Sequence, residues 1–345
     1  MKDTKQPYHP TTEAIAIFSR PETWQFLQVS GPAVALSVSD IPREEGFVFA
    51  PFDPGAEPTY FVRGKPREID INDFQEPETW HIRERKIKAT DRSLYQELFE
   101  QALDFIGTHE SEKIVLSARA IGDSLIPSIP GILTELREAY PTAFVYAFYL
   151  PDKEFWIGAT PELLWETTPD VHRTVALAGT MQHGDQLEVW GGKERLEHRY
   201  VEWFVEEQLG DRSYTKSGPR PVKAGPIYHL KTEYEIALQE SDINPVDFHP
   251  GPALSGYPVP SAVRWIIQNE HEPRRYYTGF LGPVTETGQS ALYINLRCVE
   301  ILQSGNVYYA GGGLTSDSNV DSEWKEIQDK LSTLRSKFRY DQETV

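Results

Sequence analysis

The chain has 345 residues, 39% of them hydrophobic and 12% aromatic, a formal net charge of −18, and a single cysteine, Cys298. This composition indicates a globular protein of one or two domains that can bury a core without disulfides. The charge argues against nucleic acid or an anionic membrane as a partner, and the lone cysteine excludes an internal disulfide or a cysteine-based zinc site.

Short apolar runs between prolines and glycines predict strands and turns in residues 1–75. Apolar periodicity then predicts, in chain order, a helix at 93–106, a strand at 113–117, a helix at 130–139, a strand at 143–149, a hairpin-like pair at 154–158 and 163–167, a strand at 171–178 and a helix at 193–209. Pro-rich turns follow, and then a helix near 260–269, strands at 276–282, 291–302 and 306–310, and a helix at 321–335.

Strands that come in runs, rather than in strict alternation with helices, favour an α+β fold with large antiparallel sheets. No composition shift marks a linker, so residues 1–345 are expected to form a single large domain. The amino-terminal segment has no apolar signal region and no run reaches the length of a membrane span, which predicts a cytoplasmic protein without a membrane partner.

Three consecutive glycines, Gly311, Gly312 and Gly313, precede the last predicted helix. At 100° per residue, Glu323, Glu326 and Lys330 share one face of that helix, at the edge of an apolar stripe. Glycines let a ligand approach the backbone, carboxylates hold a hard cation, and a lysine holds an anion. The segment therefore indicates a site for a metal-bound carboxylate, although a Gly-rich turn before a solvated helix would look the same.

Glu197 lies within the expected apolar stripe of the helix at 193–209, which comprises Leu196, Tyr200, Val201, Trp203, Phe204 and Val205. A carboxylate there needs a partner. Either it forms a buried salt bridge, or it binds a metal ion with Glu326 as a second ligand, as Mg²⁺ is commonly held. Glu194, one turn earlier, borders the same place.

Other candidate residues are single charges at defined positions. Lys113 begins a strand and is either simply exposed or, if it lines a pocket, a base whose pKa burial lowers. Glu162 follows Pro161 in a turn and is either an ordinary turn acid or a carboxylate of fixed direction. Arg297, central to a predicted strand, would pair with a carboxylate of the protein or of a ligand. Cys298 is expected to be a small core residue.

Eight sequence blocks together resemble the chorismate-utilising enzymes, which include isochorismate, anthranilate, aminodeoxychorismate and salicylate synthases. In order they are KIVLS, GATPELL, LAGT, KERLEH, HPGPALSGYP, EPRRYYTG, INLRC and AGGGLTSDSNVDSEWKEIQDK. They lie within a motif-bearing core at residues 111–335, whereas residues 1–110 match poorly. The resemblance implies one α+β domain in which two large antiparallel sheets pack face to face with helices outside.

The resemblance also implies roles for single residues. Glu197 and Glu326 would bind Mg²⁺, with Glu194 and Glu323 as candidates for an outer, water-mediated shell. Lys330 and the amides of the three glycines would hold the ring carboxylate of chorismate. The remaining substrate-binding residues would be Arg297 and Tyr277 at the pyruvyl carboxylate, Gly179 and Thr180 at the ring, and His229 near the ring.

Among the family members, isochorismate synthases are the most similar, because Ala253 and Leu254 stand in the block PALSG and a lysine stands at position 113. We expect Lys113 to deprotonate a water that attacks C2 of chorismate, and Glu162 to protonate the hydroxyl that leaves C4. No obligatory protein partner is expected. Salicylate synthase, an aminating subunit that works with a glutaminase, and an inactive homologue are the alternatives.

Overall fold

The computed structural model describes residues 11–181, 185–224, 227–238 and 243–338. Every pairing between described strands is antiparallel, and two successive sets of strands can be distinguished. Sheet I runs, edge to edge, through β13 (Gly256–Tyr257), β6 (Lys113–Ile121), β17 (Val307–Leu314), β16 (Cys298–Glu300), β8 (Glu154–Thr160), β7 (Phe144–Leu150) and β1 (Thr11–Ser19).

Sheet II continues from β1 through the hairpin partner β2 (Phe26–Leu36), so that the two sheets form one connected network. Its strands follow as β5 (Arg67–Ile69) and β4 (Thr59–Arg63) beside β2, and then β3 (Gly46–Ala50), β14 (Phe280–Val284), β15 (Ser290–Ile294), β9 (Leu163–Thr167), β10 (Val171–Met181), β12 (Ile227–Ala237) and β11 (Tyr214–Ala224).

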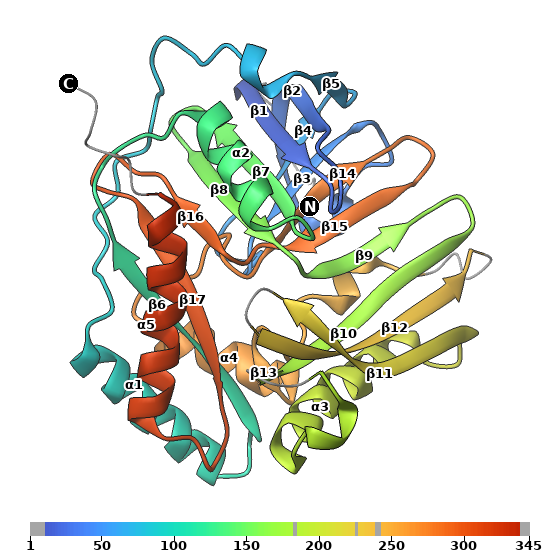
Figure 1. Ribbon diagram of the computed structural model, residues 1–345, viewed down its shortest axis with the longest axis vertical. Coiled ribbons are helices and arrows are strands. Elements are labelled where there is room, and N and C mark those ends of the chain that lie inside the picture. Colours follow the sequence, from blue (N-terminus) through green and yellow to red (C-terminus); the bar gives the residue numbers. More distant parts are fainter. Residues whose placement is uncertain (1–10, 182–184, 225–226, 239–242, 339–345) are drawn as a thin grey trace, which may run out of the picture.

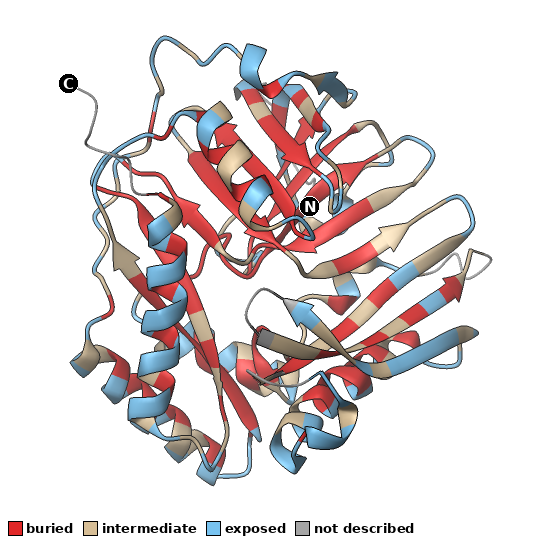
Figure 2. Ribbon diagram, viewed as in Figure 1, coloured by how far each residue is buried: buried red, intermediate tan, exposed pale blue. Residues whose placement is uncertain are grey.

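The two sheets face each other across an aromatic core, and helices cover their outer faces (Figure 1). Helices α1 (Arg92–Gly107), α2 (Ile129–Ala139), α4 (Val259–Asn269) and α5 (Val320–Lys337) pack on sheet I, and α3 (Gly192–Leu209) packs on sheet II. Figure 2 shows the sheets as largely buried and the outward faces of the helices as exposed. The expected α+β fold, with packed antiparallel sheets and helices outside, is confirmed.

Strand β7, with the sequence FVYAFYL, shows why central strands here are apolar on both sides. Phe144, Tyr146 and Phe148 enter the core between the sheets, whereas Val145 and Ala147 face the core under the helices. Side chains of a strand alternate between its two faces, so a strand buried on both faces carries a continuous apolar run. The amino-terminal strands join the same layers, since β1 pairs with β7 and β3 with β14.

Several predicted elements were wrong where pairing is long-range. The segments at 154–158 and 163–167 do not pair as a hairpin: β8 pairs with β7 and β16, and β9 with β10 and β15, because the chain crosses from sheet I to sheet II between them. The stretch predicted as Pro-rich turns contains the long strands β11 and β12. The strand predicted at 276–282 begins only at Phe280.

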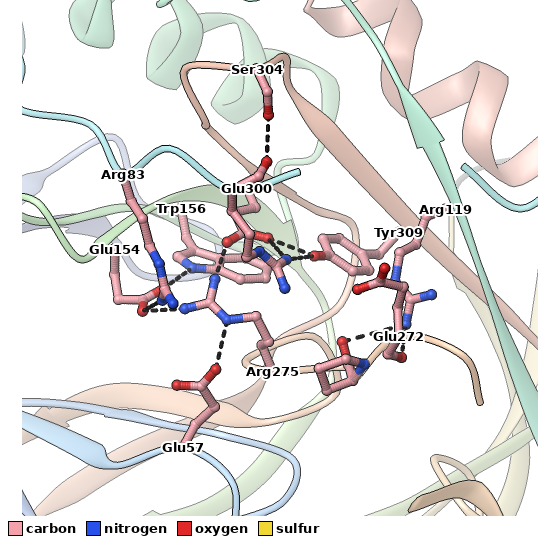
Figure 3. A network of polar contacts seen from close by, with 12 residues as sticks. Glu57, Arg83, Arg119, Glu154, Trp156, Glu272, Arg275, Glu300, Ser304 and Tyr309 are labelled. Carbon is pink, nitrogen blue, oxygen red and sulfur yellow. Dashed lines mark hydrogen bonds and ion pairs between the residues drawn. The ribbon is translucent and has the colours of Figure 1, made fainter. Parts of the chain in front are cut away.

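A buried ion network ties the two sheets together around Arg275 (Figure 3). Its guanidinium pairs with Glu154 of β8 and Glu300 of β16, and its Nε lies 2.9 Å from Glu57 in the segment before β4. Tyr309 donates to Glu300 at 2.7 Å. Burial raises the pKa of Glu154 to about 7, although the arginine opposes this shift.

Among the helices of the described ranges, none combines the length and apolar character needed to cross a bilayer.

Replacing Arg275 with Met is expected to destabilise the fold by about 3–5 kcal/mol. The buried carboxylates of Glu154 and Glu300 would lose their shared buried cation and would keep only the more exposed arginines Arg83 and Arg85. Denaturant unfolding monitored by tryptophan fluorescence measures this loss. The control is Arg63→Met, which removes an exposed pair with Glu44 at 3.0 Å and should cost less than about 1 kcal/mol. Equal losses in the two variants would contradict a stabilising role for the network.

Candidate active site

The site is built on the antiparallel pair β6–β17. A turn was one alternative for the glycine run, but the run lies inside β17, where Gly311 pairs with Ser117 and Gly313 with Val115. A Cβ atom at Gly313 would lie 2.7 Å from Cε of Lys113, and one at Gly311 would lie 2.9 Å from Oη of Tyr277. Glycines are therefore required here because the side chains of Lys113 and Tyr277 lie directly against the strand.

The edge of β17 that faces away from β6 is open to polar groups. Lys330 of α5 donates to the carbonyl of Gly311 at 2.9 Å across this edge. Because N–H and C=O of one strand residue point to the same edge, the amides of Gly311 and Gly313 face the same way. Gly312 faces α5, where its Cβ position lies 3.6 Å from Oε2 of Glu323.

Lys113 is buried, with 4% of its surface exposed, so the alternative of an ordinary exposed lysine is wrong. Burial lowers its pKa, and the cations Lys330 and Lys193 add to this effect. Glu197 opposes it, with Oε2 lying 3.9 Å from the ammonium nitrogen, and so does Glu162. This loose ion pair leaves Lys113 easier to deprotonate than a lysine in water.

Glu162 lies where the chain crosses between the sheets after β8. Its carbonyl accepts from the N–H of Ile294, which fixes the backbone at the start of β9. Burial raises the pKa of Glu162 to about 7, and the charges of Arg297 and Lys113 oppose this shift. Burial thus favours a neutral amine at Lys113 and a protonated acid at Glu162, which are the states of a general base and a general acid.

Carboxylates from α3 and α5 gather beside Lys113. The pKa of Glu323 is raised by burial and by the charges of Glu326 and Glu197, and its Oε1 accepts from Ser318 at 2.9 Å. Glu326 is paired with Lys330 at 2.7 Å. Glu194 lies near Gly179, since a Cβ atom added to that glycine would be 3.0 Å from the Glu194 carbonyl.

These residues fit a hard divalent cation in chemistry but do not form a complete shell. Within the described ranges, no three His, Cys, Asp or Glu side chains are already arranged around a common metal position. Mg²⁺, however, is usually held by one or two carboxylates together with water and a substrate oxygen. The mutual repulsion between Glu197, Glu323 and Glu326 is what such an ion would relieve. Their metal-binding roles stay predictions.

The apolar stripe predicted for α3 was partly wrong. Leu196 and Trp203 are 45% and 43% exposed, whereas His198 and Glu202 are buried. Glu202 accepts from Thr232 at 2.9 Å and pairs with Lys216 at 3.0 Å. Sequence reasoning could not find this pair, because its partners lie on β11 and β12, which were predicted as turns.

Strands β10 and β12 carry Gly179, Thr180 and His229, which were expected to lie near the ring of the substrate. Gly179 and Thr180 lie at an irregularity in the β10–β12 register, and the side chain of Thr180 is outside the described residues. Nδ1 of His229 donates to the carbonyl of Gly179 at 2.8 Å, and burial lowers the pKa of this histidine. Bulges of this kind commonly redirect backbone groups beside active sites.

The prediction that Arg297 is central to a strand was wrong. Arg297 lies in the break between β15 and β16, where its φ is 48°. Its guanidinium lies over the ring of Tyr140, 5.5 Å from the centroid. Burial lowers its pKa, while Tyr140 and Glu162 oppose the shift. Tyr277 is buried and stacks on Tyr309, and burial raises its pKa.

Ala253 and Leu254 line a small cavity together with Glu162. Leu254 belongs to the core of sheet II, and its carbonyl accepts from Arg274 at 2.7 Å. Cys298 is buried in the core between the sheets, as expected.

The sequence analysis did not name two residues that lie near the site, Lys193 and Tyr140. Lys193 would have been suggested by its position beside Glu194, whereas nothing in the sequence marks Tyr140.

A family model described as chorismate binding enzyme matches residues 65–339. Isochorismate synthase EntC of Escherichia coli is 26% identical over 314 residues, covering 84% of this chain and 79% of the relative. Anthranilate synthase component 1 of Saccharolobus solfataricus is 28% identical over 282 residues, covering 74% of this chain and 65% of the relative.

The fold is shared with a solved structure described as a putative 2,3-dihydroxybenzoate-specific isochorismate synthase, DhbC, from Bacillus anthracis. The TM-score is 0.77 at 22% identity, and the match covers 94% of this chain and 95% of the other. The family match reaches upstream of the predicted core, and the structural match includes most of residues 1–110, for which the sequence suggested no likeness.

Replacing Glu162 with Gln is expected to stabilise the protein at pH 8 but not at pH 4. The folded-state pKa of about 7 lies above the value of 4.5 for an unperturbed glutamate, so the wild type loses stability as the pH rises between these values. Above pH 7 the variant should be more stable by on the order of 2–3 kcal/mol.

Denaturant unfolding at both pH values measures this difference. Glu68→Gln, at an exposed position of β5, is the control and should change stability by less than about 0.5 kcal/mol at either pH. A Glu162→Gln effect that does not depend on pH would show that the carboxyl titrates normally.

Proposed function

Because the chain belongs to the chorismate binding enzyme family, we propose that it is an isochorismate synthase that converts chorismate to isochorismate with Mg²⁺. The observation that carries this proposal is that a buried lysine, Lys113, and a partly buried glutamate, Glu162, have pKa values shifted in opposite directions. Two titratable groups whose pKa values are shifted in opposite directions are typical of an acid–base pair that acts on one substrate.

In the proposed reaction, neutral Lys113 takes a proton from a water whose oxygen forms a bond to C2 of the ring. The ring double bonds shift, and the C4–oxygen bond breaks as protonated Glu162 gives its proton to the departing hydroxyl, which leaves as water. One water enters and one leaves, so the reaction is an isomerisation. General acid–base catalysis of this kind contributes about 10²–10⁴-fold to the rate.

The other residues would hold the substrate between these two groups. Arg297 and Tyr277 would bind the pyruvyl carboxylate, and Lys330 with the amides at the open edge of β17 would bind the ring carboxylate. Gly179, Thr180 and His229 would line the ring. Mg²⁺, held by Glu197 and Glu326 with Glu194 and Glu323 in the outer shell, would neutralise the ring carboxylate.

The presence of Ala253 and Leu254 beside Glu162 supports a hydroxylating enzyme rather than an aminating one or a salicylate synthase. We further propose that the enzyme acts without an obligatory partner subunit, in the cytoplasm, and that its product feeds menaquinone or siderophore synthesis. The matched proteins include a vibriobactin-specific isochorismate synthase of Vibrio cholerae and MenF, the menaquinone-specific isochorismate synthase of Escherichia coli.

Incubation of the purified protein with chorismate and Mg²⁺, followed by chromatography of the products, tests the function. Isochorismate alone is expected, and it should disappear when EDTA is added. Release of salicylate and pyruvate would indicate a salicylate synthase, and an amino product that requires ammonium would indicate an aminating enzyme. No turnover of chorismate under any of these conditions would indicate an inactive homologue.

Lys113→Ala and Glu162→Gln should each reduce kcat by at least about 100-fold while the fold is retained. Lys113→Arg is the matched control for charge, since arginine keeps the cation near Glu197 but cannot act as a base. Added methylamine should restore activity to the alanine variant and not to the arginine variant. Rates close to wild type in Lys113→Arg would remove Lys113 from the role of base.

The wild-type kcat/KM should decrease as the pH rises through about 7, because Glu162 must be protonated to act. It should also decrease on the acid side, where the ammonium form of Lys113 accumulates. A pH profile of kcat/KM measures both limbs. A rate that continues to rise above pH 8 would contradict the role of Glu162 as general acid.

Glu197→Ala should lose activity together with its response to Mg²⁺. Titration of the rate with Mg²⁺, compared between variants, measures this effect. Glu207→Ala, at an exposed position of the same helix, is the control and should titrate like the wild type. An unchanged Mg²⁺ response in Glu197→Ala would exclude this residue from metal binding.

A further inference from the structure

A second cavity, of about 380 Å³, lies at the opposite edge of β6 from the proposed active site. At this edge the N–H of Ser117 donates to Glu270 at 2.9 Å and the N–H of Arg119 donates to Thr90 at 3.1 Å, so both point away from β17. Leu94 and Leu98 of α1 form the apolar wall of the cavity. Its volume is within the range of small-molecule sites.

Arg119 lines this cavity and lacks a counter-ion. Only 5% of its surface is exposed, yet no carboxylate of the described residues lies within ion-pair distance. Its Nη2 donates to the carbonyls of Glu272 and Pro273, the latter at 3.4 Å, and its Nε has no hydrogen-bond partner. Figure 3 shows the side chain between Tyr309 and Glu272. A buried cation in this state favours binding of an anion.

Two other buried arginines, Arg137 and Arg274, form more hydrogen bonds than Arg119 does. Arg137 is buried at the end of α2 and donates to three carbonyls, two of them, those of Arg20 and Ala143, at 2.9 Å. Arg274 binds both oxygens of Glu270 and two carbonyls. Glu270 bonds to Arg274 and Ser117, and Arg119 acts on it only from beyond ion-pair distance, where its charge helps to lower the pKa of Glu270.

We propose that this cavity binds a small molecule with a single carboxylate, which pairs with Arg119 while its apolar part packs on Leu94 and Leu98. Three carboxylates, Glu97, Glu270 and Glu272, line the cavity together with the cations Lys88 and Arg119, and this excess of negative charge disfavours a polyanion such as a phosphate ester. The site is distinct from the chorismate site, because the width of the β6–β17 pair separates the two open edges.

The proposal is tested on the full chain by measuring the binding of 3-methylbutanoate and of phenylacetate with ligand-observed NMR. Their neutral amides, 3-methylbutanamide and phenylacetamide, have the same shape without the charge. At least one acid should bind saturably, and its amide should bind at least tenfold more weakly. The Arg119→Gln variant should bind the acid more weakly than the wild type by a similar factor. Failure of both acids to bind, or binding that Arg119→Gln leaves unchanged, would overturn the proposal.

Three further variants keep the test decisive if Arg119→Gln does not fold. Leu94→Trp fills the cavity without removing its charge and should abolish binding, whereas Gln101→Trp, on the exposed face of the same helix, should not. Lys330→Ala changes the chorismate site and should leave binding intact. Loss of binding in Lys330→Ala with retention in Leu94→Trp would place the acids in the chorismate site and refute the second site.

Discussion

The antiparallel pairing of β6 with β17 is the constraint on which the rest of the site depends. It sets Gly313 opposite Val115, and the missing side chain leaves the space that Lys113 occupies. Its open edge on β17 presents the Gly311 carbonyl to Lys330, and its open edge on β6 is capped by Glu270. A shift of one residue would turn every side chain of the strand to the other face and dismantle the site.

Buried charges in this fold are of two kinds, and the number of their partners distinguishes them. Arg275 is saturated by Glu57, Glu154 and Glu300, and this network ties sheet I to the segments that precede the strands of sheet II. Lys113 has only a loose contact with Glu197 at 3.9 Å. Saturated charges stabilise the fold, whereas charges without close partners keep shifted pKa values and remain available for chemistry.

The parts of the structure that follow from local sequence were predictable. The helices at 93–106, 193–209 and 321–335 were expected from apolar periodicity, and each lies within about two residues of the observed helix. The predicted site residues were expected mainly from their family blocks, and the structure places three of them, Glu162, Glu197 and Lys330, close enough to Lys113 to influence its pKa. Strands β11 and β12 and the break at Arg297 were missed, because long-range pairing rather than local pattern determines them.

The sequence by itself determined the α+β class, the family and the residue types of the site, because periodicity, composition and motifs are local properties. Only the tertiary structure decided which charges are buried. Lys113 could have been exposed and Glu162 an ordinary turn acid until the sheets were packed, since desolvation depends on residues distant in the chain. The same holds for Arg119, whose guanidinium has no carboxylate within ion-pair distance among the described residues and whose neighbouring cavity is lined by segments more than a hundred residues apart.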